Sequence, residues 1–356
     1  MQKYSLNVLM AACAILLLVL AQFRIIDNYI QAVIMFVGIN IMMSTSLNLV
    51  NGNMGEFTCG HAAYMCVGAY LSSVLSVMFF GKTLGDPMLP PDMAVFVFPL
   101  IILAGGVLAA ITSILVAIPS FKTRDDYLAI ITIAVNYIVI SAIENMDFVG
   151  GSRGFRGMKD TVWAMKDFMK GPWMLFWVIA FTAFTIWVIR RFITSTYGKG
   201  VNAICQDEVA AEIMSVNTNK IKTVNFMISA GLAGCAGGLF AHIIGYVNPQ
   251  SFNILKSTEA MVMVYLGGMG SLSGAVIAAV VFTGLMEVLR SQAIMDFLLA
   301  PATFVFPDWE PSAGVIKWVM IPLMLVLIMQ FRPEGILGNK ELSDVFPKLK
   351  KYYTFK

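Results

Sequence analysis

Charged side chains are scarce in this chain of 356 residues: Asp, Glu, Lys and Arg make up 13% of it, whereas 58% of the residues are apolar. So few charged groups cannot supply the polar surface that a water-soluble fold of this length needs. The mean hydropathy of +0.79 points the same way. We therefore expect a polytopic membrane protein.

Residues that carry chemistry are also scarce. The chain has two histidines, and its five cysteines show neither disulfide nor metal-site spacing. Gly81-Lys82-Thr83 matches the end of a nucleotide-binding Walker A motif, but Ser76 stands where the leading glycine is required. We expect no metal, no cofactor and no catalytic residue, so any ATP hydrolysis would belong to another chain.

Long apolar runs are abundant. They cover residues 6–23, 29–55, 57–81, 93–121, 127–143, 171–189, 223–255, 260–286 and 318–331. Most approach or exceed the roughly 20 residues that a helix needs to cross about 30 Å of hydrocarbon. None alternates in polarity as a barrel strand would. The sequence predicts an all-α fold with about 8 to 10 transmembrane segments in one transmembrane domain, residues 1–356.

The positions of Lys and Arg predict the orientation, because basic loops stay in the cytoplasm. Basic residues collect near residues 122–124, between 190 and 222, and in the tail at 332–356, which we expect to be cytoplasmic. Lys3 places the N-terminus on the same side. The first run resembles a signal peptide, but an uncleaved anchor is favoured. We interpret 144–170 as an external loop, and the basic tail is also suited to bind anionic lipid.

Two apolar runs are interrupted by glycine. Gly52-Asn53-Met54-Gly55 breaks the second run, and a similar G-x-M-G pattern within residues 267–274 breaks the eighth. Matching breaks in two halves indicate an internal repeat and a translocation pathway, although 29 glycines will produce some matches by chance. The candidate pathway residues, at or beside the breaks, are Asn48, Gly52, Gly55, Thr58, Gly267, Gly268, Gly270 and Ser271.

A separate row of glycines, Gly231, Gly234, Gly237 and Gly238, is better explained by close helix packing.

The segment 197–217 predicts a short amphipathic helix between spans. Asp207 is suited to be its N-cap, and an apolar stripe follows at helical spacing, with Glu208 and Glu212 on or beside the opposite face. Such a stripe can enter a groove on another protein, or it can lie on lipid headgroups. The candidate docking residues are Asp207, Glu208, Val209, Ala210, Ala211, Ile213 and Met214.

Six segments carry a resemblance to a known family. They cover residues 48–70, 123–134, 150–158, 229–252, 266–274 and 332–338. The first reads N-L-V-N-G-N-M-G-E-F-T-C-G-H-A-A-Y-M-C-V-G-A-Y, the third G-G-S-R-G-F-R-G-M and the last R-P-E-G-I-L-G. In order and spacing they resemble the LivM-type permease of branched-chain amino acid ABC importers.

The resemblance implies a type II ABC importer-like permease of the bacterial inner membrane, which works with a homologous LivH-type permease, two ABC ATPase subunits and a periplasmic solute-binding protein. Membrane lipid is a further expected partner, and nucleic acid is not. The segment 197–217 then matches the ATPase-coupling segment of the family, except that Cys205 and Gln206 replace the usual Arg and acid and Ser215 replaces the usual Gly. The implied solutes are leucine, isoleucine and valine. A urea or short-chain amide permease and, less favoured, an ion-coupled secondary transporter are the alternatives.

Overall fold

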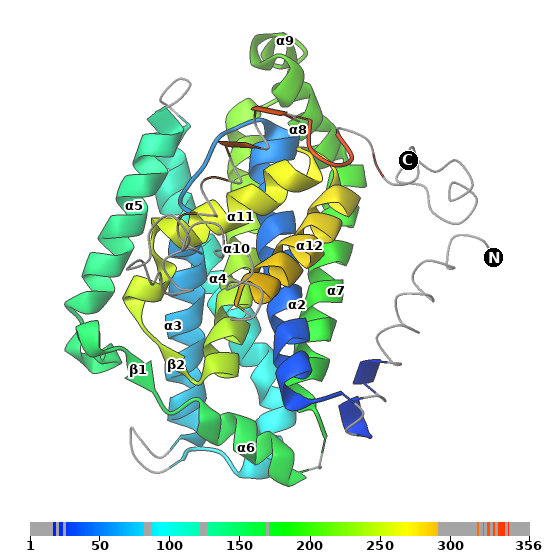
Figure 1. Ribbon diagram of the computed structural model, residues 1–356. Coiled ribbons are helices and arrows are strands. Elements are labelled where there is room, and N and C mark those ends of the chain that lie inside the picture. The colour runs from blue at the N-terminus through cyan, green and yellow to red at the C-terminus, as the bar shows by residue number, and fades with distance from the viewer. Residues whose placement is uncertain are drawn as a thin grey trace, which may run out of the picture.

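The computed structural model describes residues 26–81, 87–121, 127–168, 171–290, 334–338 and 341, with short pieces at 17–18, 21–23 and between 319 and 331. These residues form a bundle of helices with one small two-stranded sheet (Figure 1). Most of the predicted spans at 6–23 and 318–331, and most of the tail at 332–356, lie outside the described residues.

Seven helical segments among the described residues are long and apolar enough to cross a membrane. Their helices are α2 (Asn28–Asn48), α3 (His61–Phe80), α4 (Ala94–Ser120), α5 (Tyr127–Glu144), α7 (Trp173–Thr194), α10 (Thr218–Ile244) and α12 (Leu272–Arg290). Each falls within or overlaps one predicted run, which confirms the all-α polytopic fold.

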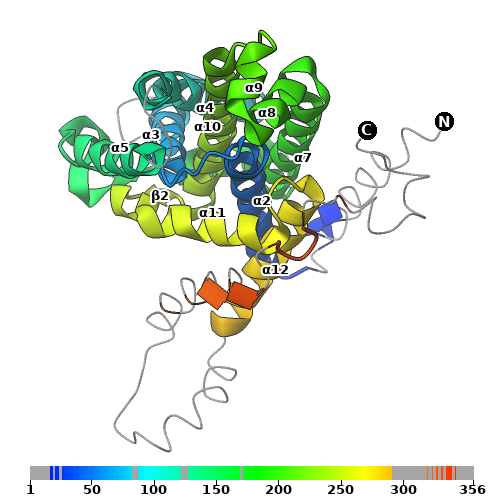
Figure 2. The same ribbon diagram turned by 90° about the horizontal axis from the view of Figure 1, so that it is seen from above.

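The centre of the bundle contains α2, α3, α4 and α10, with α5 on one flank and α7 on the other (Figures 1 and 2). Glycines allow the central helices to touch. A Cβ on Gly68 of α3 would clash with the backbone of Gly234 on α10, and a Cβ on Gly237 would clash with the carbonyl of Met65. The glycine row of α10 therefore packs helix on helix, as the sequence predicts.

Two predicted runs contain more structure than one helix each. The run at 223–255 ends as a helix at Gly245, whose φ is +74°, and continues as strand β2 (Tyr246–Val247), a 3₁₀ turn (Pro249–Phe252) and the start of α11 (Ile254–Gly267). The run at 260–286 is two helices, the end of α11 and α12. An apolar run shows no sign where the chain turns between two apolar elements. The sequence therefore predicted one span where the chain forms several elements. In Figure 2, α11 lies across the bundle and not along it.

The two ends of the bundle carry different structures (Figure 1). At one end, the segment 144–170 contains two 3₁₀ turns (Asp147–Val149 and Gly151–Arg153), strand β1 (Phe155–Arg156) and helix α6 (Lys159–Phe168). Strand β1 pairs antiparallel with β2.

At the opposite end lie α8 (Thr196–Gln206) and α9 (Glu208–Ile213). The single helix predicted for 197–217 is therefore two helices, which are separated by the extended residue Asp207.

Candidate functional site

The first glycine break ends α2 in a wide π-helical turn, Leu49–Met54, of a kind that is frequent at functional sites. Gly55 follows with φ of +78°, in the left-handed region that a side chain disfavours. The chain then returns towards the bundle and begins α3 at His61. The break therefore reverses the chain at the end of α2 that lies near α8.

The second break separates α11 from α12. Gly268 and Gly270 have φ values of +105° and +79°, and α12 begins two residues later. The described part of the R-P-E-G-I-L-G motif packs against this break, since Ile336 N–H donates to the Leu266 carbonyl at 2.8 Å. Glu341 Oε1 accepts a hydrogen bond from Leu272 N–H at 2.8 Å and so caps α12.

The two breaks touch each other through Asn48, the last residue of α2. Its Oδ1 accepts a hydrogen bond from Gly270 N–H, and its Nδ2 donates to the Ser271 carbonyl, both at 3.0 Å. Gly52 lies so close to Gly270 N and to the Asn48 side chain that it has no room for a Cβ. Four candidate pathway residues thus form one contact between the halves of the chain.

The other four candidates lie around this contact. Thr58 is buried on the return towards α3, where its N–H donates to Asn51 Oδ1 at 3.3 Å. Gly55 faces α8. Gly267 packs against the start of α12, and Gly268 packs against residues 334–338. That these residues line a translocation pathway stays a prediction.

The α8–α9 pair presents the predicted apolar stripe. Val209, Ile213 and Met214 are 67%, 78% and 78% exposed, and Ala210 is exposed beside them. Asp207 Oδ1 accepts a hydrogen bond from Ala210 N–H at 3.0 Å, which confirms the N-cap. The candidate Ala211 is different, because it is buried and does not contribute to the exposed patch.

Ser215 ends α9 under strain. It is the single non-glycine residue with a positive φ, +62°, among the described residues. Its N–H donates to the Glu212 carbonyl at 2.9 Å, and Val216 N–H donates to the Ala211 carbonyl at 3.1 Å. This pair of bonds is the Schellman motif, whose left-handed position glycine normally fills. A glycine, the residue that the family resemblance leads us to expect at this position, would adopt this conformation without the strain.

The acidic residues of α9 are held by partners and do not form a freely solvated face. Glu212 Oε1 accepts a hydrogen bond from the Thr218 hydroxyl at 2.8 Å. Glu208 forms an ion pair at 2.8 Å with Lys222 of α10, which also pairs with Glu56 at 2.7 Å. The sequence analysis missed Lys222, because no local pattern brings residues 56, 208 and 222 together.

Comparison with known proteins assigns the family. Residues 29–329 match the family described as the permease component of branched-chain amino acid transport systems. The chain belongs to this family. The permease is thus a multi-pass membrane protein of a transport system, and the family is one of transport subunits and not of enzymes.

The permease is 28% identical over 323 residues to "High-affinity branched-chain amino acid transport system permease protein LivM" of Escherichia coli K12, across 84% of this chain and 68% of the relative. It is 21% identical over 347 residues to a "Probable branched-chain amino acid transport permease protein LivM" of Methanocaldococcus jannaschii, across 91% and 97%. The LivH permease of Escherichia coli K12 is 26% identical over 170 residues, 48% of each chain. No solved structure matches the permease.

Helix α11 of the permease carries a largely buried ion pair. Lys256 Nζ lies 2.7 Å from Glu259 Oε2, and the two side chains are 18% and 9% exposed. The neighbouring Ser257 hydroxyl accepts a hydrogen bond from Ala62 N–H at the start of α3, at 3.0 Å. The sequence analysis did not identify this pair, although its i, i+3 spacing is the available signal.

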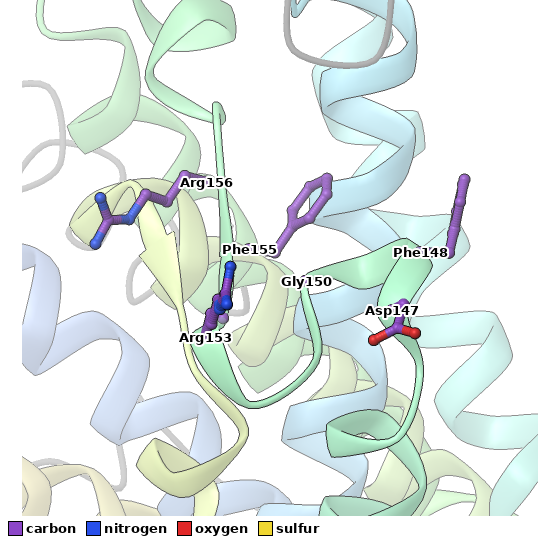
Figure 3. Close-up of a pocket in the computed structure, with 7 residues that line it drawn as sticks. Asp147, Phe148, Gly150, Arg153, Phe155 and Arg156 are labelled. Atoms are coloured by element: carbon purple, nitrogen blue, oxygen red, sulfur yellow. The ribbon is translucent and has the colours of Figure 1, made fainter.

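At the α6 end, the loop between α5 and α6 forms an open hollow of about 730 Å³ (Figure 3). It is lined by Asp147, Phe148, Gly150, Arg153, Gly154, Phe155 and Arg156. The Arg156 guanidinium lies 5.0 Å from the centre of the Tyr246 ring. Arg153 and Arg156 thus both line this hollow, at the end of the bundle opposite α9.

Proposed function

We propose that this permease forms, with a homologous LivH-type permease, the membrane channel of an ABC importer for leucine, isoleucine and valine in the bacterial inner membrane. Two ABC ATPase subunits hydrolyse ATP, and a periplasmic binding protein delivers the solute. The family match across residues 29–329 carries this proposal. Relatives named LivM and LivH support a pair of homologous permeases, one of each kind.

The ATPase docks at α9. The exposed side chains of Val209, Ile213 and Met214 give this helix an apolar patch on a polar end of the bundle. The patch is held rigid by the Asp207 cap and by the ion pair of Glu208. An amphipathic helix with these properties fits a groove on a partner protein. Docking makes the α8–α9 end cytoplasmic and the α6 end external. Lys3 and the basic residues of the tail favour a cytoplasmic location for both chain termini as well.

The solute passes beside the two glycine breaks. Breaks of this kind leave backbone groups that lipid cannot satisfy, so they are tolerated where they face protein or a cavity. At the contact between the breaks, the Asn48 side chain hydrogen-bonds the Gly270 N–H and the Ser271 carbonyl. The pathway between the two permeases is lined by Gly52, Gly55 and Gly270, which are at least partly exposed, while the buried Asn48, Thr58 and Ser271 support the breaks from within the bundle.

The ion pair in α11 is also a feature that an ion-coupled carrier would need, because such carriers keep ionisable groups within the membrane. Lys256 and Glu259 neutralise each other within one helix. A carrier driven by an ion gradient also has no use for a docking helix. The ABC importer therefore accounts for more of the structure.

The solute class is tested by the binding protein that works with this permease. After purification from cells and mild unfolding, the released solute is identified by mass spectrometry. Leucine, isoleucine or valine supports the proposal. Urea or a short-chain amide would instead assign the alternative permease class, with the same docking and channel.

A further inference from the structure

One face of α10 holds the broken end of α2. Asn225 Nδ2 donates to the Leu49 carbonyl at 2.9 Å, and the Ser229 hydroxyl donates to the Ser46 carbonyl at 2.5 Å. Lys222 precedes Asn225 by three residues and so lies on the same face, at the end nearest α9. Helix α10 therefore reaches from the last turns of α2 to helices α8 and α9.

Lys222 joins three segments that are distant in the sequence. Its Nζ lies 2.7 Å from Glu56, directly after the first glycine break, and 2.8 Å from Glu208, the first residue of α9. The Lys222 side chain is 6% exposed, whereas that of Glu208 is 45% exposed. A buried ammonium needs a paired carboxylate, because an unpaired buried charge is strongly disfavoured. Separation of Lys222 from either carboxylate is therefore unfavourable.

A second contact joins the first glycine break to the α8–α9 pair. Gly55 packs against α8, where a Cβ on it would lie 3.0 Å from Cys205 Sγ. Burial, and after it the charge of Glu56, raises the pKa of the Cys205 thiol. The end of the first break thus contacts α8 directly and is linked to α9 through Lys222.

We propose that Lys222 is a positioning residue that transmits movement of α9 to the first glycine break during transport. The proposal rests on the docking of the ATPase at α9. When α9 shifts, Glu208 draws Lys222 with it, since separation would leave the ammonium with less compensation. Lys222 in turn displaces Glu56, next to Gly55. The first break contacts the second, so both breaks respond to one movement.

The test uses proteoliposomes that contain the full complex: this permease, its partner permease, the ATPases and the leucine-loaded binding protein. Two quantities are measured, the stimulation of ATP hydrolysis by the loaded binding protein and the leucine taken up per ATP hydrolysed. Lys222→Met should lower both by about tenfold, a typical size for coupling between sites. Lys220→Met is the matched control, because Lys220 is exposed two residues away, and it should leave both quantities unchanged.

A second set of variants separates transmission from a folding defect. Glu56→Gln and Glu208→Gln each leave Lys222 with one carboxylate, so both proteins should fold. If Lys222 links the two, Lys222→Met combined with Glu208→Gln should lose no more coupling than Lys222→Met alone, because one path is interrupted once and no unpaired ammonium is buried. Independent, multiplying losses would overturn the proposal, as would wild-type coupling in Lys222→Met. A wild-type complex that loaded binding protein does not stimulate would instead overturn the proposed function, and the inference with it.

Discussion

Asn48 and Gly270 join the two halves of this permease: the Asn48 Oδ1 accepts the Gly270 N–H at 3.0 Å, and the same amide donates to the carbonyl of the next residue. One side chain at the end of α2 therefore satisfies two backbone groups of the break between α11 and α12. Asn48 is buried, so water cannot replace either bond.

Asn48→Ala should destabilise the permease and impair transport. Each backbone group left unsatisfied costs about 1–3 kcal/mol. Asn40→Ala is the matched control on the same helix: Asn40 Nδ2 donates to Thr283 Oγ1 at 2.9 Å, and that hydroxyl keeps its bond to Ala279. The control should cost about 0.5–1.5 kcal/mol. Thermal unfolding in detergent compares the two variants, and equal losses would show that Asn48 has no special role.

Gly52→Ala should also be damaging, because its Cβ would overlap the Asn48 side chain and Gly270 N. Such overpacking costs about 1–3 kcal/mol. Gly284→Ala is the control, since nothing lies within 4 Å of a Cβ at that position of α12. It should gain about 0.5–1 kcal/mol from better helix propensity.

Both glycine variants are measured for leucine uptake at equal amounts of inserted protein. If Gly52→Ala loses leucine uptake and Gly284→Ala keeps it, transport requires the contact between the two breaks. Full uptake by Gly52→Ala would show that the close approach of the breaks is dispensable.

Ser215→Gly should stabilise α9. A side chain in the left-handed region costs roughly 1–2 kcal/mol, and glycine removes that cost while losing more freedom on folding. We expect a net gain of about 0.5–1 kcal/mol, seen as slower amide hydrogen exchange in residues 208–213. Ser215→Ala retains the Cβ and should show no gain. Equal exchange in both variants would contradict the strain at Ser215.

Ile213→Asp should prevent docking of the ATPase. Ile213 is 78% exposed, so the substitution leaves the fold of the permease intact. In the complex it would bury an unpaired charge in the interface, which costs several kcal/mol. Asn145→Asp adds the same charge at an exposed position that follows α5, at the opposite end of the bundle, and serves as control. Co-purification of the ATPase is the measurement, and unchanged recovery with Ile213→Asp would place the docking surface elsewhere.

Much of this architecture follows from local sequence. Continuous apolar runs predict the seven described spans, because crossing hydrocarbon requires about 20 apolar residues. The Asp207 cap is predictable for a similar reason, since capping depends on neighbours within one turn. The glycine breaks also stand out locally.

The contacts between distant segments could not be predicted. Nothing near Lys222 in the sequence indicates Glu56, and nothing near Asn48 indicates Gly270, because these pairs form only when the bundle closes. Ala211 was included among the docking residues with the rest of the coupling segment, because the sequence does not show that this side of the six-residue helix packs against its neighbours. Similarly, hydropathy could not separate α11 from α12.

The central claim is that this chain is the permease subunit of an ATP-driven importer. Uptake of labelled leucine into proteoliposomes tests it most directly, with the full complex compared with the purified chain alone. The account predicts uptake by the complex that requires ATP and the binding protein, and no uptake by the chain alone under a proton or sodium gradient. Leucine accumulation by the chain alone, driven by such a gradient, would contradict it.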